Sequence, residues 1–162
     1  MDDRPRFLCD EMLGSLCRYL RAAGYDTAFA GNGTGDAQLL RQCHAEGRYF
    51  LTQDTLIREH KAANGIALIL PHAPLDRLAE LVGAHYRLDW TTHAFTRCLV
   101  DNSPLTEADA AAIARAPQDA RHPAEPLRHC PLCGRVYWRG SHYKRMKERL
   151  AAWQARHLPA LT

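Results

Sequence analysis

Short apolar runs alternate with amphipathic segments over the first 90 residues of the chain. Short apolar runs are typical of buried strands, whereas apolar residues at i, i+3, i+4 and i+7 form one face of a helix. On this pattern we predict strands at 7–9, 25–30, 49–52 and 66–70. We predict helices that begin near residues 13, 36, 54 and 75. The first two should end at Gly24 and Gly47, since glycine commonly terminates helices.

Strands that alternate with helices predict parallel βαβ units. We therefore expect an α/β fold, a three-layer sandwich with a central parallel sheet over residues 5–90. Residues 91–142 hold many prolines and cysteines and little periodicity, apart from a local helix within 104–116. The predicted division is an α/β domain over 1–90 and a small zinc-ribbon-like subdomain with a terminal helix over 91–162.

The terminal helix is predicted over 142–157. Its apolar stripe suits a face that docks onto the α/β part of the chain. Four basic residues surround the stripe: Lys144, Arg145, Lys147 and Arg149. The stripe itself consists of Tyr143, Met146, Leu150 and Trp153.

Composition places the chain among soluble globular proteins. It has 162 residues, 46% of them hydrophobic and 24% charged, which suits one domain with a small appendage. The apolar runs are too short to span a bilayer, and the first residues lack the apolar core of a secretory signal. From these features we expect a cytoplasmic protein.

Charge is divided unevenly along the chain. Residues 121–162 hold nine Lys or Arg and two Glu, a net charge of +7, whereas residues 1–120 carry −4. A basic tail of this kind either contacts a polyanion such as RNA or is simply a solvated helix.

Two of the six cysteines form the knuckle Cys130-Pro131-Leu132-Cys133-Gly134. Two thiolates at this spacing reach one tetrahedral metal ion, and the glycine permits the tight turn. In a cytoplasmic protein the pattern favours zinc over a disulfide. Cys98 lies in a similar polar segment, while Cys9, Cys17 and Cys43 sit singly in apolar segments as small hydrophobic residues.

Three aspartates occupy positions where ligands bind in α/β proteins. Asp10 and Asp54 follow predicted strands, and Asp36 begins a predicted helix. Ligands bind beyond the carboxyl ends of parallel strands, and clustered carboxylates attract Mg²⁺ or Mn²⁺. The alternative is that Asp36 and Asp54 are helix N-caps. The neighbouring Glu11 is interpreted as a solvated charge.

Four sequence blocks resemble the Mut-7 C-terminal ribonuclease family. They are FLCDEMLG from Phe7, YLRAAGYDT from Tyr19, GRYFLTQD from Gly47 and CPLCGRVYWRGSH from Cys130. The resemblance implies a PIN-like nuclease domain joined to a zinc ribbon, and a metal-dependent RNA-cleaving activity. It places the family's acidic positions on Asp10, Asp36 and Asp54, with Mg²⁺ or Mn²⁺ as the cofactor.

The chain departs from the family at one metal position. The family pattern has C-x-x-C-N before the insert, whereas this chain has Cys98-Leu99-Val100-Asp101-Asn102. A zinc site of Cys98, Asp101, Cys130 and Cys133 is therefore expected, because aspartate also binds zinc through oxygen. His93, His129 or His142 are alternatives to Asp101, and a further alternative is that the metal has been lost.

RNA, for example tRNA or rRNA, is the expected partner. Arg18 and Arg21 could instead be solvated helix charges, and Ser141 is expected to cap the last helix, with the role of His142 open. The alternative functions are a non-catalytic RNA-binding or adaptor protein and a protein-interaction module. An enzyme would need all three aspartates, whereas an RNA-binding protein would tolerate their conversion to asparagine. The candidate RNA contacts are Arg18, Arg21, Trp138, Arg139, His142, Lys144 and Arg145.

Overall fold

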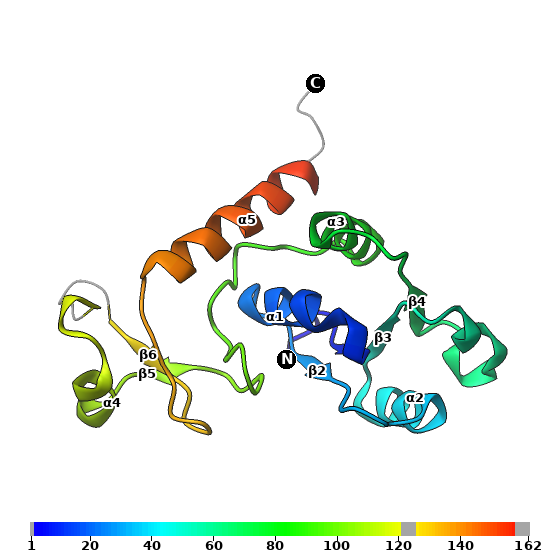
Figure 1. The fold of residues 1–162 in the computed structure, drawn as a ribbon, viewed down its shortest axis with the longest axis horizontal. Coiled ribbons are helices and arrows are strands. Elements are labelled where there is room, and N and C mark those ends of the chain that lie inside the picture. Colours follow the sequence, from blue (N-terminus) through cyan, green and yellow to red (C-terminus); the bar gives the residue numbers. More distant parts are fainter. Residues whose placement is uncertain (1, 121–125, 158–162) are drawn as a thin grey trace.

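The computed structural model describes residues 2–120 and 126–157 (Figure 1). Within these residues a four-stranded parallel sheet forms the centre, with strand order β2-β1-β3-β4. The predicted α/β fold with a central parallel sheet is confirmed. The strands are β1 (Phe7–Cys9), β2 (Thr27–Phe29), β3 (Tyr49–Thr52) and β4 (Ala67–Ile69).

Helices cover both faces of this sheet (Figure 1). The α-helices are α1 (Gly14–Ala22), α2 (Asp36–Glu46) and α3 (Leu75–Tyr86). Alternate residues of a strand point to opposite faces, so Phe7 and Cys9 of β1 join the core beneath α1 and α3, while Leu8 joins the core beneath α2. The sheet therefore separates two hydrophobic cores.

The segment after β3 differs from the prediction of one short helix. It forms two 3-10 helices, η2 (Thr55–Glu59) and η3 (Lys61–Ala63). His60 lies between them with an extended backbone (φ −89°, ψ 118°), which interrupts the helical hydrogen bonds. A further 3-10 helix, η1 (Glu11–Leu13), precedes α1 and was not predicted.

The ribbon is a small antiparallel sheet with strand order β5-β6-β7. Its strands are β5 (Thr106–Glu107), β6 (Arg128–His129) and β7 (Val136–Tyr137). The predicted local helix is α4 (Ala110–Arg115), followed by the 3-10 helix η4 (Gln118–Ala120). Arg121 and Glu125 of the basic tail lie outside the described residues.

The terminal helix α5 (Ser141–His157) crosses back onto the α/β part of the chain (Figure 1). Met146, Leu150 and Trp153 are buried in the core formed by α1 and α3, which confirms the docking stripe. The indole Nε1 of Trp153 donates to Asp76 Oδ1 of α3 at 2.9 Å. Tyr143 instead packs against Phe95, with ring centroids 4.3 Å apart.

The described part of α5 shares one hydrophobic core with α1 and α3, so it packs with the α/β part of the chain, and the domain boundary near residue 90 stays a prediction. Over the described parts of the chain, no helix has the length and apolar character needed to cross a membrane.

Candidate active site and metal centre

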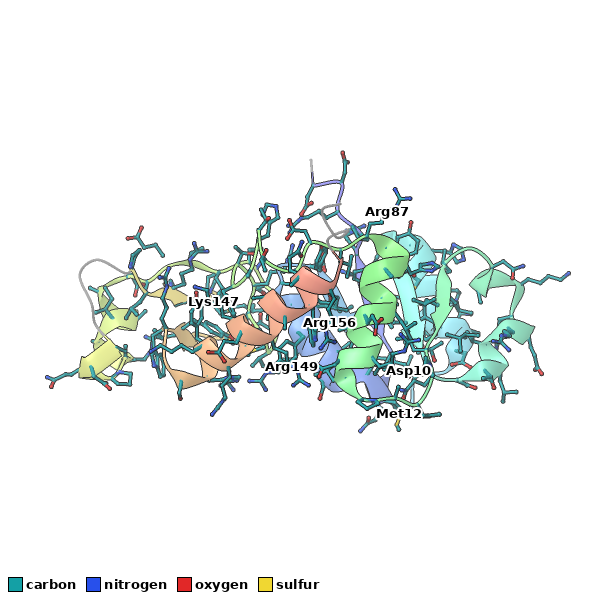
Figure 2. All side chains as sticks on the ribbon, turned by 90° about the horizontal axis from the view of Figure 1, so that it is seen from above. Asp10, Met12, Arg87, Lys147, Arg149 and Arg156 are labelled. Atoms are coloured by element: carbon teal, nitrogen blue, oxygen red, sulfur yellow. The ribbon has the colours of Figure 1, made fainter. Side chains whose placement is uncertain are left out.

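The carboxyl ends of β1 and β3 meet at the switch point of the sheet. From β1 the chain runs outward to β2 and then crosses to β3 on the other side, so a crevice forms between β1 and β3. Asp10 directly follows β1, and Asp54 lies two residues beyond β3. Figure 2 shows Asp10 and Met12 at one edge of the molecule, opposite Arg87, which ends α3.

Thr52 connects the two aspartates. Its hydroxyl donates to Asp10 Oδ2 at 2.9 Å and accepts from the Asp54 backbone N–H at 3.0 Å. The Thr52 side chain is completely buried, so it has few other arrangements available. Thr52 therefore fixes the carboxylate of Asp10 relative to the turn that carries Asp54.

Asp10 and Asp54 are also N-caps. Asp10 Oδ1 accepts from the Glu11 N–H at 2.7 Å, and Asp54 Oδ1 accepts from the Leu56 N–H at 2.9 Å. The N-cap alternative is thus correct for Asp54 and extends to Asp10. It is wrong for Asp36, which lies in the first turn of α2 behind Gly35, a cap with no side-chain hydrogen bond.

Asp10 and Asp54 line one hollow of about 650 Å³ at this edge. Asp36 does not line it, and the described residues hold no trio of aspartates whose oxygens lie within 4.8 Å of one another. The structure therefore brings two of the three predicted aspartates together and leaves Asp36 at the start of α2. The complete lining is Asp10, Met12, Gln53, Asp54, Thr55, Arg58, Ile69, Leu70, Pro71 and His72.

Thr52, Arg58 and His72 escaped the sequence analysis. Thr52 stands at the end of an apolar strand, two residues before Asp54. A polar residue at this position is the sequence feature that could have identified it. Arg58 and His72 follow β3 and β4 in segments that leave the same sheet edge as Asp10. Among the described residues that line the hollow, Arg58 is the one Lys or Arg and His72 is the one histidine.

The second site is a cluster of three thiols and one carboxylate. The ligand atoms of Cys98, Asp101, Cys130 and Cys133 lie within 4.8 Å of one another. The Sγ atoms of Cys98 and Cys133 are 3.8 Å apart, and Cys130 Sγ lies 3.1 Å from Asp101 Oδ2. Three sulfur donors and one oxygen at these distances suit a tetrahedral zinc ion.

The two halves of this cluster share one backbone geometry. In the first, the Asn102 N–H donates to Cys98 O at 3.0 Å; in the second, the Gly134 N–H donates to Cys130 O at 2.9 Å. Both Asn102 (φ 72°) and Gly134 (φ 79°) adopt the left-handed conformation that these two residue types tolerate best. Asp101 therefore occupies the position equivalent to Cys133.

Hydrogen bonds favour the charged forms of Cys98 and Asp101, whereas burial and contacts with Asp101 and the other thiols raise the pKa of Cys133 to about 12. Burial raises the pKa of Cys98, but hydrogen bonds from the Tyr137 hydroxyl and the backbone outweigh it, so this pKa lies below its usual value. For Asp101, the effect of burial is outweighed mainly by the Ser103 N–H, at 2.9 Å, and its pKa is also lowered. The histidine alternatives are not part of the cluster of described residues.

Arg21 attaches the first half of the cluster to the α/β part of the chain. Only 8% of Arg21 is exposed. Its Nε donates to Thr27 O at 2.9 Å, and its Nη1 donates to Leu99 O at 3.1 Å and Val100 O at 3.0 Å. The guanidinium is thus buried and hydrogen-bonded to three carbonyls, which leaves little of it open for the RNA contact that the sequence predicted.

A cleft of about 570 Å³ lies between the ribbon, α1 and the start of α5. Four predicted RNA contacts line it: Arg18, Trp138, Arg139 and His142. Arg18 Nη2 lies 3.2 Å from His142 Nε2. Lys144 and Arg145 do not line the cleft and are exposed on α5.

The expected Ser141 cap is wrong by one residue. The Lys144 N–H donates to Gly140 O at 3.0 Å, which is the first hydrogen bond of α5. The carbonyl that accepts this bond belongs to the N-cap, so Gly140 holds that position and Ser141 is the first helical residue.

The chain matches the model of a known family. The family model described as Mut7-C RNAse domain matches residues 5–150, which include every candidate site residue above. No curated protein and no solved structure matches the chain.

Proposed function

Because the chain belongs to the Mut7-C RNase domain family, we propose that it is a metal-dependent ribonuclease that hydrolyses RNA phosphodiester bonds. One observation supports this proposal above the others. Asp10 and Asp54 follow neighbouring parallel strands at the switch point, line one hollow and are hydrogen-bonded to the same residue, Thr52. A PIN-like arrangement of the sandwich is part of the proposal.

The donors at this edge fit a hard divalent cation. Carboxylate oxygens are the ligands that Mg²⁺ and Mn²⁺ prefer. Within the described residues, Asp54 Oδ2 has no hydrogen bond, so it is available as a ligand atom. Asp10, Asp54 and Asp36 are the proposed ligands. Asp36 is expected to contribute least to metal binding, because it does not line the hollow.

When bound, Mg²⁺ or Mn²⁺ would activate water and offset charge on the leaving oxygen. The chain's own residues orient the reaction. Thr52 holds the Asp10 carboxylate, and Arg58 provides a positive charge for a phosphate in the hollow. Thr52 and Arg58 are thus positioning and phosphate-binding residues in this proposal.

The ribbon has a structural part in the same proposal. Cys98, Asp101, Cys130 and Cys133 would hold one zinc ion and so fix the fold of the ribbon. The RNA substrate, for example tRNA or rRNA, would contact residues of the cleft and of α5. These residues are Arg18, Trp138, Arg139, His142, Lys144 and Arg145.

Asparagine substitution separates the catalytic role from the capping role. Asn caps helices as well as Asp does, so Asp10→Asn and Asp54→Asn should keep stability but lose most Mg²⁺- or Mn²⁺-dependent cleavage of a labelled RNA. Asp36→Asn should lose less of this cleavage activity than Asp10→Asn or Asp54→Asn. The matched control is Asp3→Asn, an exposed aspartate outside the hollow. Unchanged cleavage in both Asp10→Asn and Asp54→Asn would contradict the proposal.

The alternative function is a non-catalytic RNA-binding protein. The N-cap roles of Asp10 and Asp54 favour it, because capping explains these aspartates without any metal. In that case Asp54→Ala would lower stability by about 0.5–2 kcal/mol, while the wild-type protein would bind RNA and cleave none.

A further inference from the structure

The cleft beside the ribbon is distinct from the catalytic hollow. Its lining shares no residue with the lining of the hollow that holds Asp10 and Asp54. Its volume of about 570 Å³ falls within the range of small-ligand sites. It is therefore large enough to receive part of a substrate that also reaches the hollow.

The cleft is strongly basic. Among the described residues that line it there are five arginines and no Asp or Glu. Arg18 comes from α1, Arg128 from β6 and Arg135 from the turn before β7. Arg128 and Arg135 are exposed and form no ion pair within the described residues. The natural ligand of such a surface is an anion with several charges, such as a nucleic-acid backbone.

Trp138 adds an aromatic surface to this basic cleft. It is 42% exposed, so much of this large aromatic side chain is open to solvent. Its indole lies close to Gly140, where an added Cβ would be only 2.9 Å from Nε1 and 3.2 Å from Cδ1. Gly140 thus leaves room for this orientation of the ring beside the arginines.

We propose that this cleft binds single-stranded RNA, with an unpaired base stacked on Trp138 and the adjacent phosphates paired with Arg18, Arg128 and Arg135. The inference rests on RNA being the substrate, as proposed above. Stacking needs a base whose face is free, which duplex RNA does not offer along its length. The site would select single-stranded segments and leave cleavage to the Asp10 and Asp54 edge.

Binding is measured separately from cleavage in an Asp54→Asn background, by fluorescence anisotropy with a short labelled single-stranded RNA. Adding Trp138→Ala should weaken binding by about fivefold or more. The matched control, Leu132→Ala, removes a side chain that is 73% exposed on the same ribbon but does not line the cleft, and it should have no effect. The duplex form of the same RNA should bind more weakly and respond little to Trp138→Ala.

The arginines are tested by salt dependence. Arg18→Ala and Arg128→Ala should each reduce the slope of log affinity against log salt by about 0.7, the value for one contact to a single strand. Arg41→Ala, an exposed arginine on α2, is the control. Equal effects of Trp138→Ala and Leu132→Ala would overturn the inference, as would tighter binding of the duplex. Competition by an acidic peptide as effective as that by RNA would also overturn it and indicate a protein partner.

The two proposals can fail independently. Wild-type protein that cleaves no RNA, but whose binding to single strands depends on Trp138, would refute the catalytic proposal and support this site. Cleavage that is lost in Asp54→Asn, together with RNA binding that is unchanged in Trp138→Ala, would support the catalytic proposal and refute this site.

Discussion

The buried hydroxyl of Thr52 donates a hydrogen bond of 2.9 Å to Asp10 Oδ2, between the ends of two neighbouring strands. The Thr52 hydroxyl oxygen also accepts a hydrogen bond from the Asp54 N–H, so one small side chain sets the relative position of both carboxylates in the hollow. Such supporting contacts determine how well a metal ligand is oriented.

Removal of this hydroxyl should weaken the metal site without removing a ligand. Thr52→Val keeps the shape of the side chain, and we expect cleavage at limiting Mn²⁺ to fall about 10-fold to 100-fold. Added Mn²⁺ should recover part of the loss. Thr52→Ser keeps the hydroxyl and should retain activity, which separates the hydrogen bond from packing. Equal activity in the valine and serine variants would show that Thr52 has no role in metal binding.

The second prediction concerns Asp101, the one carboxylate of the proposed zinc site. Asp101→Cys would give four thiolates, the softer donor set that zinc prefers, so the variant should hold zinc more tightly than the wild type. Asp101→Ala should hold it more weakly. The measurement is zinc release to a chromogenic chelator, with total zinc from elemental analysis. A wild-type protein purified without chelator and free of zinc would contradict the proposed metal centre.

Arg21 should be important for stability and unimportant for direct RNA contact. Arg21→Met leaves the carbonyls of Thr27, Leu99 and Val100 without this donor, and we expect the free energy of unfolding to fall by about 1–3 kcal/mol. Arg18→Met, on an exposed residue of the same helix, should change it by less than about 0.5 kcal/mol. Chemical denaturation measures both. A fully stable Arg21→Met protein would show that these hydrogen bonds contribute little.

The environment of Asp26 predicts that the protein loses stability at acid pH. Burial opposes its ionisation, but hydrogen bonds from Arg48 and Asn102, both 2.7 Å, outweigh burial and hold the pKa of Asp26 below the usual 3.8. A carboxyl whose pKa is lowered in the folded state stabilises the protein above its unfolded pKa. This contribution is lost as the pH falls through the folded pKa, so the melting temperature should drop below about pH 4.

Asp26→Asn removes the titrating group and tests this origin. Its melting temperature should be lower than that of the wild type near neutral pH, and the difference should shrink as the pH falls. Asp3→Asn, at an exposed position, should follow the wild-type curve. A constant difference between Asp26→Asn and wild type across the acid range would assign the acid sensitivity to other groups.

Local patterns in the sequence predicted features that depend on near neighbours. The alternation of apolar runs predicted the four parallel strands, and the stripe through Met146, Leu150 and Trp153 predicted how α5 docks. Cys130 and Cys133 predicted half of the metal cluster from spacing alone. Asp10 and Asp54 could be placed at one edge because parallel strands end on the same side of a sheet.

Contacts between distant segments decided what local patterns left open. Arg21 is buried because Leu99 and Val100, almost 80 positions further along the chain, place their carbonyls against it. Asp36 has the position in sequence of a metal ligand, yet α2 begins outside the hollow. Trp138 and Arg18 line one cleft only because α5 returns to α1.

The sequence by itself therefore determined the four strands and three α-helices of the α/β part of the chain, the family and the types of ligand present. The tertiary structure alone decided which charged side chains are buried, which share a cavity and which face solvent. The physical reason is that hydrophobic periodicity and ligand spacing act over a few residues, whereas burial of Arg21 or assembly of the basic cleft depends on the relative placement of whole elements. That placement is set by the packing of α1, α3 and α5 into one core.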